Sequence, residues 1–460
     1  MQQSLGLTNR LYLKKAIIIF CVALLLRGLF LALVSPEPER LLHRDSDSYI
    51  KPAFAMLAGQ GFSLGSEPPV TPYAVRTPVY PLFIAAMYTV TGENLLVPAG
   101  VQVVLSAIIV ALTYFLGRQL LSDEEAYLSG WLVAFSLTSM VYALYLMTET
   151  LFTLLFLAMN LALLRYYRSG KTYWLVITGG LAGVSILCRP AALFYPFVVM
   201  LLLLLFDDRN WRKRAQAAVL SLLVTVAVVA PWVIRNYLLL GIPTVSTISS
   251  YNLLYYNAVS LEAEVRGLGE TDVRTQMYER VNEVLEPQGI ENNPDEAGAV
   301  QLYQTWARDI ILTHPFLYAY IHLKSDLNSL LPSITEFFEL LGVTQGGKGT
   351  LSVLNQHGVI AATQHYFGDK VWVIGLVLPL LALLGLTYLG AVIGVGLLIK
   401  RKDWFTLFLL LMPLLYFLLL PGAPSHPRFR VPVMPYLCLL AGIGLWQLWW
   451  LVRQKKKLNS

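Results

Sequence analysis

The stretch AIIIFCVALLLRGLFLALVSPEPERLLHRDSDSY, residues 16–49, joins a long apolar run to a short acidic loop. Its apolar part, residues 16–34, is long enough to cross a hydrocarbon core about 30 Å thick as a helix. Asp45 and Asp47 follow closely, in a place where carboxylates are costly and usually serve a function. We therefore expect a membrane protein whose chemistry lies where this first helix leaves the membrane.

The rest of the chain repeats the apolar pattern. Of its 460 residues, 56% are hydrophobic and 13% are charged, whereas a soluble protein carries about a quarter charged residues. Arg27 interrupts the first run and no small-residue cleavage site follows, so we expect this run to remain as a helix whose Arg27 faces other helices. Comparable runs predict an all-α polytopic membrane protein with about ten transmembrane helices, at residues 16–34, 97–117, 126–147, 150–166, 173–188, 191–206, 215–234, 371–399, 404–420 and 431–452.

Basic residues predict the orientation. Arg10, Lys14 and Lys15 precede the first helix, and short cytoplasmic segments collect Lys and Arg. An even number of crossings returns the basic C-terminus to the same side, so both termini are predicted to be cytoplasmic in the cell inner (plasma) membrane. The net charge of +6 then reflects contact with anionic lipid and gives no sign of nucleic-acid binding.

Two longer segments are predicted on the outer face. Residues 1–240 form an N-terminal transmembrane module with a catalytic first outer loop (35–91), in which residues 77–90 are expected to form a helix that lies at the outer surface or dips into the membrane. Residues 241–370 form an extracytoplasmic cap, and residues 371–460 the C-terminal transmembrane helices. Within the cap, spaced apolar positions predict helices over 262–312, whereas 244–257 is β-branched and rich in Tyr and Asn and has no helix signature.

Three acidic residues are candidate catalytic groups. Asp45 and Asp47 stand two apart, so on a helix only one of them reaches a given site, whereas on a strand both share a side. Either could act as a general base or hold a divalent metal, and the alternative is a solvated loop paired with Arg40 or Arg44. Glu149 lies where two spans turn at the outer face and serves either as a second acid or as a helix cap.

Five arginines next to spans are candidate phosphate ligands, because the guanidinium fork suits phosphate oxygens. The alternative for any single one is pairing with lipid headgroups. They are Arg76, Arg189, Arg235, Arg428 and Arg430.

Other patterns carry less weight. Gly342-x4-Gly347-Lys348 lacks the Ser or Thr of a phosphate loop, and His357 and His365 are eight apart, unlike a helical zinc pair. The three cysteines all fall in predicted spans and suggest no disulfide framework or metal cluster.

Several motifs in fixed order resemble one superfamily. After Asp45 and Tyr49 come GQGFS (59–63), RTPVYP (76–81), TET (148–150), CRP (188–190), APWVIRNY (230–237), Asn252-Leu253 with Asn257, and RFRVP (428–432). This order resembles the GT-C glycosyltransferases related to dolichyl-phosphate-mannose protein mannosyltransferases and to the bacterial aminoarabinose transferase of lipid A. The resemblance covers most of the chain and implies a GT-C helical bundle with an extracytoplasmic cap.

The resemblance also implies a reaction. A polyprenyl-phosphate sugar donor would pass its sugar, with inversion, to a hydroxyl of a lipid, glycan or protein acceptor on the outer face. Asp45 matches the superfamily's first-loop aspartate and would be the general base, with Asp47 as the fallback, since some branches have an adjacent acidic pair. The five arginines would neutralise the leaving phosphate. Tyr49, Tyr80, Asn236, Asn252 and Asn257 would line the substrate pocket.

No cofactor is expected, and no metal, although the oligosaccharyltransferase branch needs a divalent ion. Two rival functions remain open: a glycan polymerase or ligase that uses a polyprenyl-diphosphate substrate, and a lipid-linked sugar flippase without chemistry. A flippase would carry charged residues along the middle of the membrane.

Overall fold

The computed structural model describes residues 2–65, 71–343 and 373–458, together with residues 353, 357, 358, 361, 363–365 and 368. Within these residues the chain is helical, and the pairing of extended backbone is limited to one β-bridge between Ser63 and Pro72. The all-α polytopic fold expected from the sequence is confirmed.

Six helices are long and apolar enough to cross a membrane. They are α1 (Gln2–Val34), α4 (Leu96–Gly117), α7 (Glu149–Ser169), α10 (Trp211–Leu240), α18 (Val373–Arg401) and α20 (Met434–Leu458) with the 3₁₀ turn η6 (Pro427–Val433) before it. Shorter apolar helices are α3 (Val79–Thr91), α8 (Tyr173–Cys188), α9 (Tyr195–Phe206) preceded by η2 (Pro190–Ala192), and α19 (Trp404–Leu419). Nine of the ten predicted spans thus fall on single apolar helices, six of full length and three short ones (α8, α9 and α19), and the tenth, 126–147, falls on a bent pair of helices.

A seventh span is broken in the middle. Helices α5 (Asp123–Ala134) and α6 (Leu137–Leu144) meet at a bend of 51°, which leaves carbonyl groups at the end of α5 without helical partners. Arg27 is fully buried and donates to the carbonyls of Val133 and Ala134 at 3.2 and 3.0 Å. Arg27 faces other helices, as expected, because it satisfies backbone groups that lipid could not.

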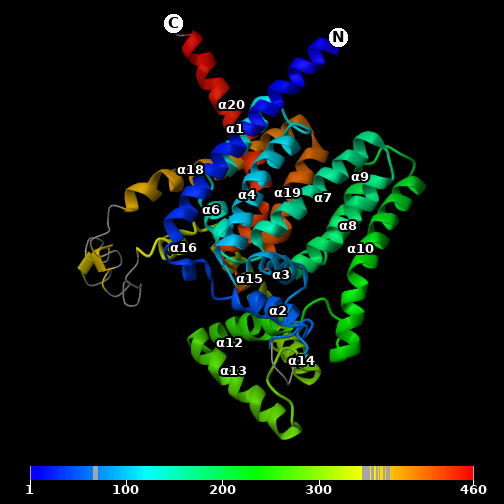
Figure 1. The fold of residues 1–460 in the computed structure, drawn as a ribbon, viewed down its shortest axis with the longest axis vertical. Helices are drawn as coiled ribbons and strands as arrows, with labels where there is room; N and C mark the ends of the chain where they lie inside the picture. Colours follow the sequence, from blue (N-terminus) through cyan, green and yellow to red (C-terminus); the bar gives the residue numbers. More distant parts are fainter. Residues whose placement is uncertain are drawn as a thin grey trace.

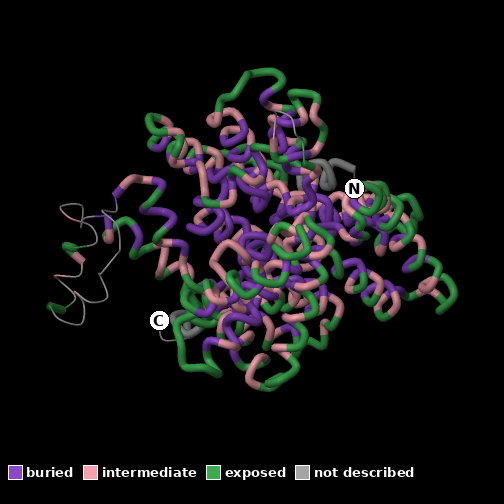
Figure 2. The backbone as a smooth tube through the Cα atoms, turned by 90° about the horizontal axis from the view of Figure 1, so that it is seen from below, coloured by how far each residue is buried: buried purple, intermediate pink, exposed green. Residues whose placement is uncertain are grey.

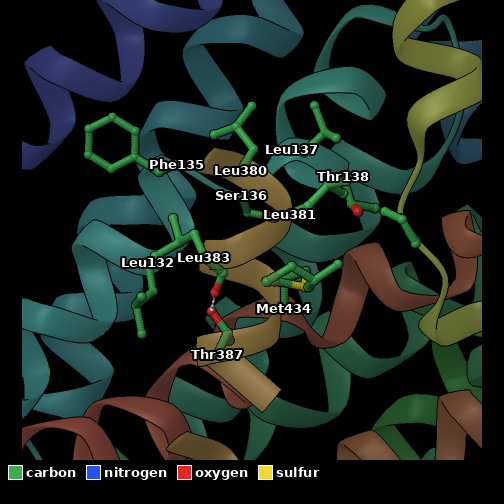
Figure 3. Close-up of a pocket in the computed structure, with 12 residues that line it drawn as sticks. Leu132, Phe135, Ser136, Leu137, Thr138, Leu380, Leu381, Leu383, Thr387 and Met434 are labelled. Carbon is green, nitrogen blue, oxygen red and sulfur yellow. Dashed lines mark hydrogen bonds between the residues drawn. The ribbon is translucent and has the colours of Figure 1, made fainter. Parts of the chain in front are cut away.

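The break also leaves a small crevice lined mainly by leucines of α18 and by residues around the bend (Figure 3). Its volume is about 20 Å³, which is room for little more than one water molecule. The crevice is therefore a packing defect of the bundle and too small for a substrate.

The two chain ends lie at the same end of the bundle, and a group of shorter helices covers the opposite end, here called the cap end (Figure 1). These shorter elements are η1 (Pro38–Leu41), α2 (Asp47–Leu57), α11 (Ile248–Asn252), the π-helix η3 (Leu253–Ala258), α12 (Val259–Arg266), α13 (Glu270–Leu285), η4 (Glu286–Gln288), α14 (Ala297–Thr313), α15 (Pro315–Asp326), η5 (Leu327–Leu330) and α16 (Ile334–Leu340).

The cap has an apolar core of its own. Val273, Met277, Val281 and Leu285 of α13 are buried against residues of η3 and α14, which confirms the helices predicted over 262–312. Seen from below, most buried residues gather in the interior of the molecule, and the outer loops are largely exposed (Figure 2). The prediction for 244–257 was wrong: α11 and η3 are helical there, because burial of the Tyr-rich segment against α14 outweighs its weak helix propensity.

Candidate functional site

A cavity of about 370 Å³ lies at the cap end of the bundle. Its lining comes from the turn before α2, the segment 75–77, the start of α7, the Arg189 turn, α11 with η3, α15, and the loop between α19 and α20. Elements from all three predicted parts of the chain therefore meet around one space.

Asp45 lies on the wall of this cavity between two arginines. Its Oδ2 accepts from Arg428 Nη1 at 2.5 Å, and its Oδ1 is 3.2 Å from Arg76 Nη2. Burial alone would raise the pKa of Asp45, but the positive charges of Arg428 and then Arg76 outweigh it and hold the pKa at about 2. Asp45 is therefore ionised and has both carboxylate oxygens paired.

Ser46 holds the turn that presents Asp45. Its hydroxyl is buried, accepts from the backbone amide of His43 at 2.8 Å, and donates to the carbonyl of Leu146 at 3.0 Å. This bond ties the first loop to the segment just before α7. Asp45 and Glu149, which are far apart in sequence, thereby reach the same cavity.

Glu149 forms the second ion pair of the cavity. Its side chain is 1% exposed, and its Oε1 is 2.6 Å from Arg189 Nη1. The other oxygen, Oε2, is buried and has no hydrogen-bond partner within the described part of the chain. Arg189 stands in extended backbone after α8 and its guanidinium faces the ring of Phe429 at 5.2 Å. The cavity wall thus carries three arginines and two carboxylates.

Asp47 does not reach this cavity. It begins α2, its side chain is 68% exposed, and its ion pair with Lys51 spans 4.0 Å. The two aspartates diverge because a turn leading into a helix sends residues two apart to different sides. The structure therefore separates the two candidates for the base, which the sequence left open.

Two of the five candidate arginines also lie away from the cavity. Arg235 donates to the backbone carbonyls of Tyr73 and Phe62, both at 2.8 Å, and so fixes the first outer loop. Arg430 is fully buried and donates to the carbonyl of Leu330 and to hydroxyls of α6 and α18. Both guanidiniums satisfy groups of the protein itself, whereas Arg76, Arg189 and Arg428 line the cavity.

Among the five predicted pocket residues, Tyr49, Asn252 and Asn257 line the cavity, with Tyr49 under the guanidinium of Arg76 at 4.7 Å. Tyr80 and Asn236 do not. The Tyr80 hydroxyl donates to Gln102 at 2.7 Å inside the bundle, and the Asn236 amide donates to a backbone carbonyl at 2.8 Å.

A second wall of the cavity is polar but contains no carboxylate or guanidinium. Asn252 and Asn257 face it from α11 and η3, and Tyr318 and His322 from α15. His322 Nδ1 and the Tyr318 hydroxyl are 3.1 Å apart, and the Tyr318 hydroxyl donates to Asn257 Oδ1 at 3.4 Å. Sequence reasoning missed Tyr318 and His322, although their spacing of four on one helix was a usable signal.

The loop between α19 and α20 connects the two walls. Gly422 has φ +63, and a Cβ there would lie 2.4 Å from His322 Nδ1 and 2.5 Å from Asn257 Oδ1. Its amide donates to Asp326 Oδ1 at 2.8 Å. Only a glycine can adopt this backbone conformation and also approach its neighbours so closely. Six residues later, Arg428 of the same loop contacts Asp45.

His426 and Glu336 support that loop, and the sequence analysis missed both. His426 Nδ1 accepts from the Arg428 amide at 3.4 Å, and its Nε2 lies 2.9 Å from Glu336 Oε1. Because Nδ1 is an acceptor, Nε2 carries the hydrogen and donates it. Burial would raise the pKa of Glu336, but the bond from His426 and further contacts lower it below the usual range. No local sequence pattern indicates a role for Glu336, because its partner His426 is distant in the sequence.

Within the described ranges, no group of three His, Cys, Asp or Glu side chains could hold a metal ion, and independence of metal stays a prediction. Gly347 and Lys348 of the phosphate-loop-like pattern lie outside the described residues. Of the cysteines, Cys188 lines the cavity and is buried, Cys438 is buried in the bundle and Cys21 is exposed on α1.

Comparison with known proteins identifies relatives of this fold. The model of the Dolichyl-phosphate-mannose-protein mannosyltransferase family matches residues 75–234, a segment that includes Arg76, Glu149 and Arg189 but neither Asp45 nor Arg428. No curated protein matches the chain by sequence.

Solved structures match along nearly the whole chain. The oligosaccharyltransferase AglB from Archaeoglobus fulgidus, in complex with an inhibitory peptide and a dolichol-phosphate, matches with a TM-score of 0.52 and 13% identity over 98% of this chain and 52% of that one. The apo form from the same organism gives 0.52 and 14% over the same shares. ArnT from Cupriavidus metallidurans bound to undecaprenyl phosphate gives 0.47 and 13% over 95% and 59%.

The chain thus spans little more than half the length of these solved structures. At these identities the likeness concerns the fold. This protein is an all-α polytopic membrane protein that resembles the GT-C glycosyltransferases, with a segment that matches the mannosyltransferase family model.

Proposed function

We propose that this protein is an integral membrane glycosyltransferase that moves a sugar from a polyprenyl-phosphate donor to an acceptor hydroxyl on the outer face of the membrane. The observation that carries the proposal is the cavity at the cap end, where Asp45 lies between Arg76 and Arg428 and beside the Glu149–Arg189 pair. A similar fold in AglB, solved in complex with a dolichol-phosphate, supports a lipid-linked donor.

The residues suggest how transfer proceeds. The acceptor oxygen attacks the anomeric carbon of the sugar while Asp45 takes the hydroxyl proton as general base. The bond between the anomeric carbon and the phosphate oxygen breaks, its electron pair stays on the phosphate, and the configuration inverts. Arg428, Arg76 and Arg189 stabilise the charge that develops on the leaving phosphate. This phosphate leaves readily, so no acid is needed to protonate it.

The position of Asp47 favours Asp45 as the base. Asp47 is exposed on α2 and outside the cavity, whereas Asp45 is on the wall where donor and acceptor would meet. Glu149 is committed to Arg189 by one oxygen, so we assign it the positioning of that arginine. Its free Oε2 is available to a substrate hydroxyl.

The uncharged wall suits the sugar. Asn252, Asn257 and Tyr318 offer neutral donors and acceptors beside His322, and such groups recognise hydroxyls without requiring a charge. The part of the lining that carries the arginines suits the phosphate. A donor bound across the cavity would place its anomeric carbon between the two walls, close to Asp45.

Sugar transfer from labelled polyprenyl-phosphate donors tests the proposal. Purified protein in nanodiscs is given a pool of polyprenyl-phosphate sugars and, separately, polyprenyl-diphosphate sugars, with lipid, glycan and peptide acceptors. We expect transfer from the monophosphate pool, a loss of at least about a hundredfold in Asp45→Asn, and wild-type rates in Asp47→Asn. Transfer from diphosphate donors alone would favour a polymerase or ligase. Equal rates in all three proteins would show that Asp45 is not the base.

A further inference from the structure

The pairing of Asp45 conflicts with its proposed role as a base. Both of its oxygens are taken, one by Arg428 at 2.5 Å and one by Arg76 at 3.2 Å. A carboxylate held in this way is fixed in place by both guanidiniums, and their positive charges lower its affinity for a hydroxyl proton, although each oxygen still has a second acceptor site. The same two guanidiniums also line the cavity and are the groups best placed to bind a phosphate.

We propose that the Asp45 carboxylate occupies the place of the donor phosphate in the unliganded protein, and that the arriving phosphate takes over Arg428 and Arg76 and releases Asp45 to act as the base. This inference rests on the proposed function. It assigns the Arg76–Arg428 pair as the phosphate subsite and makes the base available only after donor binding.

The charges permit such an exchange. The donor is a phosphodiester with one negative charge, so it replaces one monoanion with another beside the same two guanidiniums. Arg428 also has an unused hydrogen-bond donor, because its Nε is buried and has no hydrogen-bond partner in the described part of the chain. Each of the two non-bridging oxygens of a phosphodiester can accept more than one hydrogen bond, so one of them can also take this unused hydrogen.

The guanidinium of Arg76 and the backbone of Arg428 are held independently of Asp45, so we expect both to stay in place when it leaves. Arg76 Nε donates to Ser48 at 2.9 Å, and its guanidinium covers the ring of Tyr49. Arg428 follows His426, whose ring caps its backbone amide. Asp45 stands in a turn with its side chain 29% exposed, and is thus the more movable partner.

Release would also change the strength of the base. The two arginines hold the pKa of Asp45 low against the effect of burial. When the phosphate neutralises them, burial remains as the main influence and raises the pKa. During transfer the proton then moves to Asp45 while one negative charge moves to the phosphate, so the arginines gain a second charge to stabilise as Asp45 loses its own.

Binding of sugar-free phosphates tests the exchange without requiring transfer. Inorganic phosphate and a short-chain prenyl phosphate are titrated by calorimetry into the full-length protein in nanodiscs. The variants are Asp45→Asn, Glu149→Gln, Asp47→Asn and Arg428→Gln. Glu149→Gln removes the same charge from the same cavity, but from the pair that does not involve Asp45.

We expect Asp45→Asn to bind prenyl phosphate at least about tenfold more tightly than wild type, equivalent to about 1.4 kcal/mol. Glu149→Gln should gain clearly less, Asp47→Asn should match wild type, and Arg428→Gln should lose binding. The melting temperature is a second measurement in case Asp45→Asn is less stable. Without phosphate this variant should melt below wild type. Phosphate should then raise its melting temperature by more than it raises that of wild type.

Equal or weaker binding by Asp45→Asn, together with no greater thermal stabilisation by phosphate, would overturn the exchange. An equal gain in Glu149→Gln would also overturn it, because the gain would then reflect net charge alone. These outcomes are separate from the proposed function. A wild-type protein that transfers sugar without the Asp45→Asn gain refutes only the exchange, and the gain without any transfer by wild type refutes only the proposed reaction.

Discussion

The contact between His426 and Glu336 gives a sharp test of how Arg428 is positioned. Glu336→Gln replaces a buried carboxylate, 2.9 Å from His426 Nε2, with a neutral amide of the same shape. A hydrogen bond to a charged group contributes about 1.5–3 kcal/mol. If that energy holds the turn that aims Arg428, its loss reduces kcat/KM by roughly 10–150-fold.

The kinetic parameters distinguish positioning from a general loss of stability. We expect kcat/KM for the lipid donor to fall while the fraction of folded protein at the assay temperature, checked by size-exclusion chromatography, stays at the wild-type value. Glu339→Gln changes an exposed residue of the same helix, α16, and should leave kcat/KM unchanged. Glu336→Asp should recover part of the lost rate.

Acidification should reproduce the effect of Glu336→Gln only at a pH low enough to protonate Glu336. The pKa of Glu336 is lowered in the folded protein, so the stability that this contact contributes is present above the unfolded pKa and is lost as pH falls through the lower, folded pKa. The wild-type advantage over Glu336→Gln should therefore persist through the ordinary titration range of glutamate. A Glu336→Gln protein with wild-type kcat/KM at every pH would refute the positioning role.

Three further predictions concern stability and the shape of the cavity. Arg27→Met removes the donor to the Ala134 carbonyl at the end of α5, whereas the Val133 carbonyl keeps the amide of Ser136. The change should destabilise the bundle by about 1–3 kcal/mol, seen as a lower melting temperature in detergent. Arg10→Gln, at an exposed position, is the control, and equal melting temperatures would contradict the role of Arg27. Burial raises the pKa of Asp295 to about 6. Because the unfolded chain ionises at lower pH, stability falls as pH rises from about 4 to 6, by at most about 3 kcal/mol. Asp295→Asn keeps an oxygen that can accept from the backbone and should melt higher than wild type at pH 7.5 but not at pH 4; a lower melting temperature at both pH values would refute this. Gly422→Ala drives a methyl group into the uncharged wall and should lower sugar transfer at least about tenfold, whereas Gly59→Ala, which has positive φ but open space, should cost about 1 kcal/mol of stability with little effect on transfer.

Membrane helices could be predicted from the sequence because their signal is local. A run such as residues 16–34 must be helical in lipid, whatever it later packs against. Lengths were less certain: α8, α9 and α19 are apolar but short, and the break between α5 and α6 depends on Arg27, a residue about a hundred positions earlier. The helical segment formed by α11 and η3 was missed because its packing against α14 stabilises it.

Part of the candidate site could also be predicted from a local signal, the position of its residues next to apolar runs. Asp45, Glu149, Arg76, Arg189 and Arg428 all stand next to apolar runs, so their position along the membrane normal could be inferred, and the structure brings them together.

What could not be inferred was the direction in which each side chain points. Asp47, Arg235 and Arg430 have the same residue types in the same neighbourhoods, yet one is exposed and two bind backbone carbonyls. The role of Glu336 depends on tertiary contacts that a single sequence does not reveal.

The loop between α19 and α20 has a consequence for how the two substrates influence one another. Near its start Gly422 is packed against Asn257 and His322 and bonded to Asp326, and near its end Arg428 is bonded to Asp45. We therefore expect a ligand that shifts α15 to move the arginine that faces the phosphate. Binding of that ligand and binding of the lipid phosphate would then be thermodynamically linked, and each would alter the affinity of the other by the same factor. We expect the acceptor, when it contacts the cap, to change the dissociation constant of the lipid phosphate without touching it.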